Sequence, residues 1–172
     1  MFFLILATFM IPFQAVITPL FSILHTLGLN NSLLGLVLVY TTFQLPFGIF
    51  LMRNSFAALP AGIEEAALID GCGYLSALYR VMLPIAIPGL ISTALFTFFT
   101  CWNEFFAALV LVTDEAKFTL PVTLTVLASN QLGALNWGIM QAGVAVTAIP
   151  CVVLYLLLQR YYVAGLVAGA VK

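Results

Sequence analysis

The stretch Leu59–Pro88, LPAGIEEAALIDGCGYLSALYRVMLPIAIP, decides the fold because it is the most highly charged part of a chain that carries very few charges. Four of the charged residues lie in it: Glu64, Glu65, Asp70 and Arg80. Long apolar runs flank the stretch on both sides. The pattern predicts a polar loop at the point where the chain leaves a lipid bilayer.

The first half of this loop favours a short helix. Pro60 suits a first helical turn, where its missing N–H is not needed, and Glu64 and Glu65 would then lie near the positive end of the helix dipole. Gly71 and Gly73 are expected to end this helix, because glycine accepts the left-handed backbone of a sharp turn.

The second half favours another short helix, which we expect to begin near Tyr74 and to end at Pro84 and Pro88. Apolar residues recur along it at helical spacing: Leu75, Leu78, Tyr79 and Met82. The loop is therefore predicted to hold two helices joined by a tight turn.

Composition places the chain in a membrane. Its 172 residues are 64% hydrophobic and 6% charged, whereas about a quarter of the residues in a soluble protein are charged. The net charge of -1, without Lys/Arg runs, excludes nucleic-acid binding. Three widely spaced cysteines and one histidine favour neither a metal site nor a disulfide framework, and we expect no cofactor.

The apolar runs predict an all-α fold, a polytopic transmembrane bundle with a two-helix loop over residues 59–84. A helix needs about 20 apolar residues to cross a bilayer. Four spans are expected, at about 2–24, 33–52, 85–112 and 138–158. The first is expected to be one helix kinked at Pro12 and Pro19, and Arg160 is expected to end the last.

Lys and Arg set the orientation, because they gather in cytoplasmic loops. With four spans, Lys117 lies alone on one side and four basic residues lie on the other: Arg53, Arg80, Arg160 and Lys172. The 59–84 loop and the C-terminus are therefore predicted to be cytoplasmic.

The motif Glu65-Ala66-Ala67, followed by Gly71 and by Val81-x-Leu83-Pro84, resembles the Glu-Ala-Ala signature of membrane permeases of binding-protein-dependent ABC importers. The flanking segments are similar to those of sugar-uptake permeases of the maltose/glycerol-phosphate group: Gly28–Ser32, Pro46-Phe47, Trp102–Phe106 and Gln159–Tyr162. The resemblance covers essentially the whole chain. It departs at Val81, where isoleucine is usual, and at Ala164, where arginine is common.

The resemblance implies that the 59–84 loop inserts into a cleft on a separate cytoplasmic ATPase. The residues that it assigns to this coupling are Glu64, Glu65, Ala66, Ala67, Asp70, Gly71, Leu78 and Pro84. It also implies a second permease subunit, two ATPase subunits, an external solute-binding protein and a carbohydrate substrate. The chain lacks a G-x-x-x-x-G-K-[ST] motif, so we expect it to be no enzyme and ATP to be hydrolysed by a partner.

The resemblance also implies six spans, two of them before Phe2. We therefore expect either a fragment of a longer permease or a start at an internal methionine.

Glu104 is the acid expected inside a span, where a charge must face water or a partner. With Trp102 and Asn103 it is a candidate for the substrate path. The other interpretation makes Trp102 an interfacial anchor and pairs Glu104 with the partner permease. The candidate contacts with the binding protein are Asn130, Gln131, Leu132 and Gly133.

Two functions from different classes remain at this point. One is a sugar permease, and the other is a membrane subunit for anchoring or assembly that does not transport. Only the permease requires Glu65 and Gly71 for ATP turnover without requiring them for membrane insertion.

Overall fold

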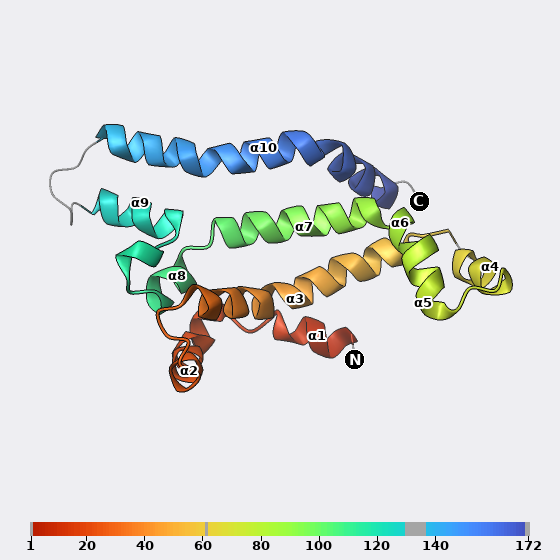
Figure 1. The fold of residues 1–172 in the computed structure, drawn as a ribbon, viewed down its shortest axis with the longest axis horizontal. Coiled ribbons are helices and arrows are strands. Elements are labelled where there is room, and N and C mark those ends of the chain that lie inside the picture. The colour runs from red at the N-terminus through yellow and green to blue at the C-terminus, as the bar shows by residue number, and fades with distance from the viewer. Residues whose placement is uncertain (1, 61, 130–136, 171–172) are drawn as a thin grey trace. The chain divides into compact units, whose positions relative to one another are not determined.

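The computed structural model describes residues 2–60, 62–129 and 137–170, and these residues form helices and turns without a strand (Figure 1). The predicted all-α class is confirmed. The chain forms two compact units. Unit 1 comprises Met1–Pro46 and Phe98–Val153, and unit 2 comprises Phe47–Thr97 and Leu154–Lys172.

Unit 1 begins with α1 (Phe2–Thr8) and α2 (Phe13–Thr26). The single kinked helix expected over 2–24 is wrong, because the chain leaves the helical conformation between them. Pro12 has no N–H to donate, and it disfavours a helical backbone at the preceding residue. Pro19 lies inside α2 without ending it.

Helix α3 (Leu33–Ala57) contributes to both units and runs through Pro46. Its first turn is capped by Ser32, whose Oγ accepts a hydrogen bond from the Leu34 N–H at 3.2 Å. The helix continues beyond the expected boundary at Met52. Neither Arg53 nor Asn54 is a strong helix breaker, so the water boundary and the helix end need not coincide.

The rest of unit 1 comes from the second half of the chain. It contains the end of α7 (Ile87–Trp102), α8 (Phe106–Leu111), the 3-10 turn Glu115–Lys117, α9 (Leu120–Ala128) and the first part of α10 (Trp137–Ala170). The expected span 85–112 is thus interrupted between Trp102 and Phe106. The expected end of the last helix at Arg160 is wrong, because α10 continues to Ala170 and glycine inside a helix costs only about 1 kcal/mol.

The core of unit 1 joins α2, α3, α8 and α9. Its buried residues are Leu24, Leu36, Val39, Ala107, Ala108, Leu111, Val112 and Val122. The Phe13 ring meets Phe43 edge to face, with ring centroids 4.7 Å apart, and Phe106 at 6.1 Å. The two alanines allow the α8 backbone to come close to its neighbours.

Unit 2 contains the end of α3, the 59–84 loop and the start of α7. The loop forms α4 (Ile63–Ile69), α5 (Tyr74–Ala77), a π-helical turn (Leu78–Met82) and α6 (Leu83–Ile85). Helices α3 and α7 meet through the Phe47 and Phe96 rings, whose centroids are 6.1 Å apart, and through Ser55 and Gly89.

Two described helices are long and apolar enough to cross a bilayer, Leu33–Ala57 and Trp137–Gln159. Tyr74–Ile85 and Ile87–Trp102 meet this test only as a pair, which bends by 73°. Phe13–Thr26 is apolar but shorter. The division into four spans stays a prediction.

Candidate functional site

Helix α4 opens the 59–84 loop with both predicted acids in its first turn, Glu64 and Glu65. The expected place of Pro60 in that turn is wrong, because α4 begins at Ile63. Gly62 precedes the helix with φ +85°, and the Ile63 N–H donates to the Pro60 carbonyl at 3.4 Å. A turn that requires glycine therefore separates the proline from the helix.

The end of α4 has the geometry of a Schellman motif. The Gly71 N–H donates to the Leu68 carbonyl at 3.1 Å, and the Cys72 N–H donates to the Ala67 carbonyl at 3.0 Å. Gly71 has φ +86°, so its predicted left-handed conformation is confirmed. The expected role of Gly73 in ending α4 is wrong, because Gly73 instead precedes α5 with φ −70°.

Helix α5 begins at Tyr74, as predicted. The helical run continues through the π turn and α6 and ends at Ile85, between Pro84 and Pro88, where its end was expected. Pro84 lies in the first turn of α6, where an N–H is not required. The chain bends only after Ile85.

The 59–84 loop exposes apolar side chains beside its acids. Ile69 is 85% exposed, Tyr74 74%, Leu75 71% and Tyr79 64%. Exposed Glu64, Glu65 and Asp70 lie on α4 and at its end. We call the four apolar residues with Glu64 and Glu65 the loop face. Apolar surface of this kind marks a binding site for another protein or for a membrane.

The small residues of the loop divide between two roles. Ala67 and Ala77 are buried, and α4 packs against α5. Ala66 is exposed, so of the alanines in the motif only Ala66 is accessible to a partner. Leu78 is half-buried and Pro84 is exposed.

Unit 1 contains a cavity of about 240 Å³ between α2, α3, the end of α7 and the start of α8. Its lining combines aromatic rings with amide, hydroxyl, thiol and carboxylate groups: Phe13, Gln14, Val39, Tyr40, Phe43, Gln44, Thr100, Cys101, Glu104, Phe106 and Ala107. Apolar walls with a few polar groups are typical of sites for small molecules.

Glu104 lies in this cavity with partners from its own chain. Tyr40 Oη donates to Glu104 Oε2 at 2.8 Å, and the N–H groups of Ala107 and Ala108 donate to the carboxylate at 2.9 and 3.3 Å. An acid at the centre of a bilayer costs roughly 3 kcal/mol on insertion scales. Hydrogen bonds to a charged group contribute about 1.5–3 kcal/mol each, so three of them offset that cost.

The two neighbours of Glu104 have other contacts. Trp102 Nε1 donates to the Thr147 carbonyl at 3.0 Å, and its ring stacks on Phe98 with centroids 5.3 Å apart. Asn103 is exposed, and its Nδ2 donates to the Phe99 carbonyl at 2.8 Å. The structure therefore brings Glu104 to the cavity, whereas neither Trp102 nor Asn103 lines it.

Sequence reasoning did not select Gln14, Tyr40 or Gln44 as site residues. Tyr40 and Gln44 are four residues apart on α3 and share one face of it. Two polar side chains on one face of a mostly apolar helix were a usable signal. The proposed docking residues Asn130, Gln131, Leu132 and Gly133 lie outside the described residues.

Comparison with known proteins identifies the family. Residues 1–166 match the model of the binding-protein-dependent transport system inner membrane component. The chain is 36% identical to the probable ABC transporter permease protein YurM of Bacillus subtilis, over 99% of this chain and 57% of that protein. It is 40% identical to the diacetylchitobiose uptake system permease protein DasC of Streptomyces coelicolor, over 95% and 58%.

The trehalose/maltose transport system permease protein MalG of Thermococcus litoralis is 36% identical, over 98% of this chain and 60% of that protein. The chain thus spans less than two thirds of the length of these relatives. The match to the family model nevertheless extends over nearly all of its residues. The chain belongs to the family of binding-protein-dependent transport system inner membrane components.

Proposed function

We propose that this chain is the permease subunit of an ABC importer and carries a carbohydrate across the cell membrane. In this proposal two copies of a cytoplasmic ATPase hydrolyse ATP, a second permease completes the pathway, and an external binding protein delivers the sugar. Family membership and two relatives named for sugar uptake support the substrate class. The exposure of the loop face is the observation that supports a role in coupling to the ATPase.

The loop face fits a protein partner rather than lipid. Its apolar side chains lie beside Glu64 and Glu65, and carboxylates are not attracted to anionic headgroups. The exposed Ala66 allows close approach at the same helix. A soluble ATPase with a basic residue beside an apolar cleft is the complementary surface.

The test of coupling is Glu65→Lys. Reversal places like charges at the interface, and we expect sugar uptake to fall by about tenfold or more while the complex still assembles in part. Uptake, ATPase activity and copurification of the ATPase are measured on the intact transporter. Glu115→Lys is the matched control, because Glu115 is an exposed acid in the 3-10 turn of unit 1. Normal uptake by Glu65→Lys would refute the coupling role.

The cavity around Glu104 is our candidate for part of the substrate path. A sugar ring presents apolar faces and hydroxyl edges, and the cavity offers aromatic rings beside the polar groups of Gln14, Gln44 and Glu104. Trp102 and Asn103 stay in the proposal as flanking residues, with weaker support, because their contacts lie elsewhere.

Glu104→Gln tests this path. The amide keeps the size of the side chain but weakens charge-assisted hydrogen bonds, and we expect uptake to fall by about fivefold while binding-protein stimulation of ATPase activity remains. Tyr40→Phe is the control, since it removes one protein partner of the carboxylate and retains the charge. If Glu104→Gln transports at the wild-type rate, the cavity is not part of the path.

The segment that follows α9 is our candidate contact for the binding protein, with Asn130 to Gly133 as its tip. The C-terminus is proposed to be cytoplasmic, on the side of the 59–84 loop. The comparisons give no support to a non-transport anchoring role, because the relatives described above are named as permeases.

A further inference from the structure

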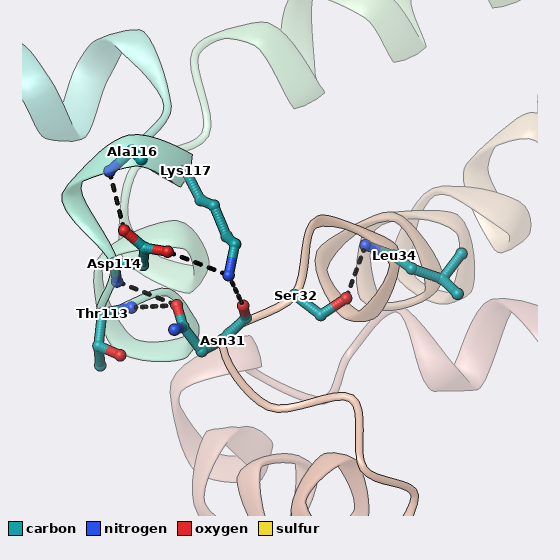
Figure 2. A network of polar contacts seen from close by, with 7 residues as sticks. All are labelled: Asn31, Ser32, Leu34, Thr113, Asp114, Ala116 and Lys117. Carbon is teal, nitrogen blue, oxygen red and sulfur yellow. Dashed lines mark hydrogen bonds and ion pairs between the residues drawn. The ribbon is translucent and has the colours of Figure 1, made fainter.

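A network of polar contacts joins Asn31, two residues before the start of α3, to the segment after α8 (Figure 2). Asn31 Oδ1 accepts hydrogen bonds from the N–H groups of Thr113 and Asp114, both at 3.0 Å. Lys117 Nζ donates to the Asn31 carbonyl oxygen at 3.1 Å. We call Asn31, Thr113, Asp114 and Lys117 the Asn31 latch.

An ion pair and a hydrogen bond stabilise the part of the latch that lies at the 3-10 turn. Lys117 Nζ lies 3.1 Å from Asp114 Oδ2, and Asp114 Oδ1 accepts from the Ala116 N–H at 3.1 Å. The hydrogen bond with Lys117 lowers the pKa of the Asp114 carboxyl below its ordinary value, and the Ala116 N–H adds to this effect. Asp114 is therefore charged at neutral pH, and the 3-10 turn is held against Asn31 as one piece.

Asn31 combines two properties that this place requires. Among the described residues it is the one non-glycine residue with a positive φ, at +52°. Asparagine tolerates this left-handed conformation better than most residues do. Its amide oxygen, in addition, accepts from two successive N–H groups, which glycine could not do.

Within the described residues, the latch connects the segment before α3 with the segment after α8, and a second polar connection joins α3 to the residues before α8. This second connection is the hydrogen bond from Tyr40 to Glu104, and Tyr40 lies about 10 Å along α3 from its start at Leu33 by helix geometry. Between the two connections, Leu36 and Val39 of α3 belong to the same buried cluster as Ala108 and Leu111 of α8. The same two helices both contribute to the cavity lining, including Tyr40 and Phe43 on α3 and Phe106 on α8.

We infer that Asn31 is a positioning residue: through the latch it holds α8 in register with α3 and so sets the width of the cavity around Glu104. The effect on transport rests on the proposed function of that cavity, whereas the effect on geometry does not. Asn31 acts at a distance, because no latch residue lines the cavity.

The test uses Cys101, a native residue of the cavity lining, as a reporter. In the intact transporter with Cys72→Ser and Cys151→Ser, the rate at which N-ethylmaleimide modifies Cys101 is measured. Asn31→Gly keeps the left-handed backbone and removes the acceptor. Loss of ordinary hydrogen bonds shifts a local equilibrium by about fivefold, and we expect the Cys101 rate to rise by that factor.

Two variants separate the latch from general loosening of α3. Ser32→Ala removes the cap of the neighbouring helix turn and leaves the latch intact, so the Cys101 rate should stay within about twofold of the wild-type rate. Asn31→Asp keeps an acceptor and a residue that tolerates positive φ, and it should stay closer to wild type than Asn31→Gly. An unchanged rate in Asn31→Gly, or equal increases in Asn31→Gly and Ser32→Ala, overturns the inference.

Sugar uptake is measured on the same variants. A faster Cys101 reaction with reduced uptake supports both the latch and the substrate path. A faster reaction with normal uptake supports the latch as a positioning device and refutes the proposed role of the cavity. Failure of the latch inference and failure of the proposed substrate path therefore give different results.

Discussion

At the residue scale, Gly71 shows how a single backbone angle shapes the 59–84 loop. Its φ of +86° completes the hydrogen bonds that end α4, and no neighbouring atom lies within 4 Å of a Cβ built at this position. The cost of a side chain there is thus conformational and not steric. Left-handed backbone costs about 1–2 kcal/mol for an L-residue.

We predict that Gly71→Val impairs ATP-driven uptake more than Gly71→Ala, because a β-branched side chain resists positive φ more strongly. Uptake and thermal unfolding of the purified complex are the measurements. Gly73→Ala is the matched control, since Gly73 has an ordinary φ of −70° and also has open space around it. Equal activity of the two Gly71 variants would show that the loop does not depend on this conformation.

At the element scale, the helices on either side of the 59–84 loop approach closely within unit 2. A Cβ added at Gly89 on α7 would lie 2.5 Å from Ser55 Cβ on α3, and closer still to Ser55 Oγ. Ser55 Oγ donates to the Leu51 carbonyl within its own helix. The contact joins the segment that enters the loop to the segment that leaves it, so we expect the loop and these helix ends to move together.

Gly89→Ala should therefore destabilise the protein by about 1–3 kcal/mol, the usual cost of overpacking, and reduce uptake. Adding Ser55→Gly removes the opposing side chain and should restore most of the loss, because the next nearest atom to the new methyl group is Ser55 Cα, at an ordinary 3.7 Å. Gly48→Ala on the same helix pair is the control, with Thr93 Cγ2 at an ordinary 3.9 Å. Thermal unfolding of the single and double variants measures this effect. If Ser55→Gly fails to restore the stability of Gly89→Ala, the close contact between Gly89 and Ser55 is not the cause of the loss.

At the scale of the whole molecule, the proposed topology places the 59–84 loop and the segment that contains the 3-10 turn on opposite sides of the membrane. In this topology four basic residues are placed on the side of the loop and Lys117 alone on the other, as the preference of Lys and Arg for cytoplasmic loops predicts. The structure offers matched positions for a test. Ala66 on α4 and Ala116 in the 3-10 turn are both exposed alanines.

Ala66 and Ala116 are replaced by cysteine, one at a time, in a background without Cys72, Cys101 and Cys151. We expect an impermeant thiol reagent outside intact cells to label Ala116→Cys and not Ala66→Cys, with the reverse pattern in inside-out vesicles. Mass tagging of the purified protein measures the labelling. Labelling of Ala66→Cys from outside would invert the orientation and remove the basis for ATPase coupling.

Local patterns in the sequence determined the membrane class, the all-α fold, the acids in the first turn of α4, the turn at Gly71 and the start of α5. These features depend on residues a few positions apart, and composition and helical spacing report such features directly. The misplaced roles of Pro12 and Pro60 have one cause. A proline excludes a hydrogen bond but does not say whether the chain breaks, kinks or changes helix type there.

Only the tertiary structure decided which polar groups meet. Tyr40 and Glu104 are 64 residues apart in the chain, and Asn31 and Thr113 are 82 apart. No spacing rule connects positions so distant, because the packing of α3 against α8 brings them together. The sequence by itself predicted that Glu104, an acid expected inside a span, must have polar partners. The fold decided that its described partners are Tyr40 and the start of α8, because burial requires the nearest donors to be used.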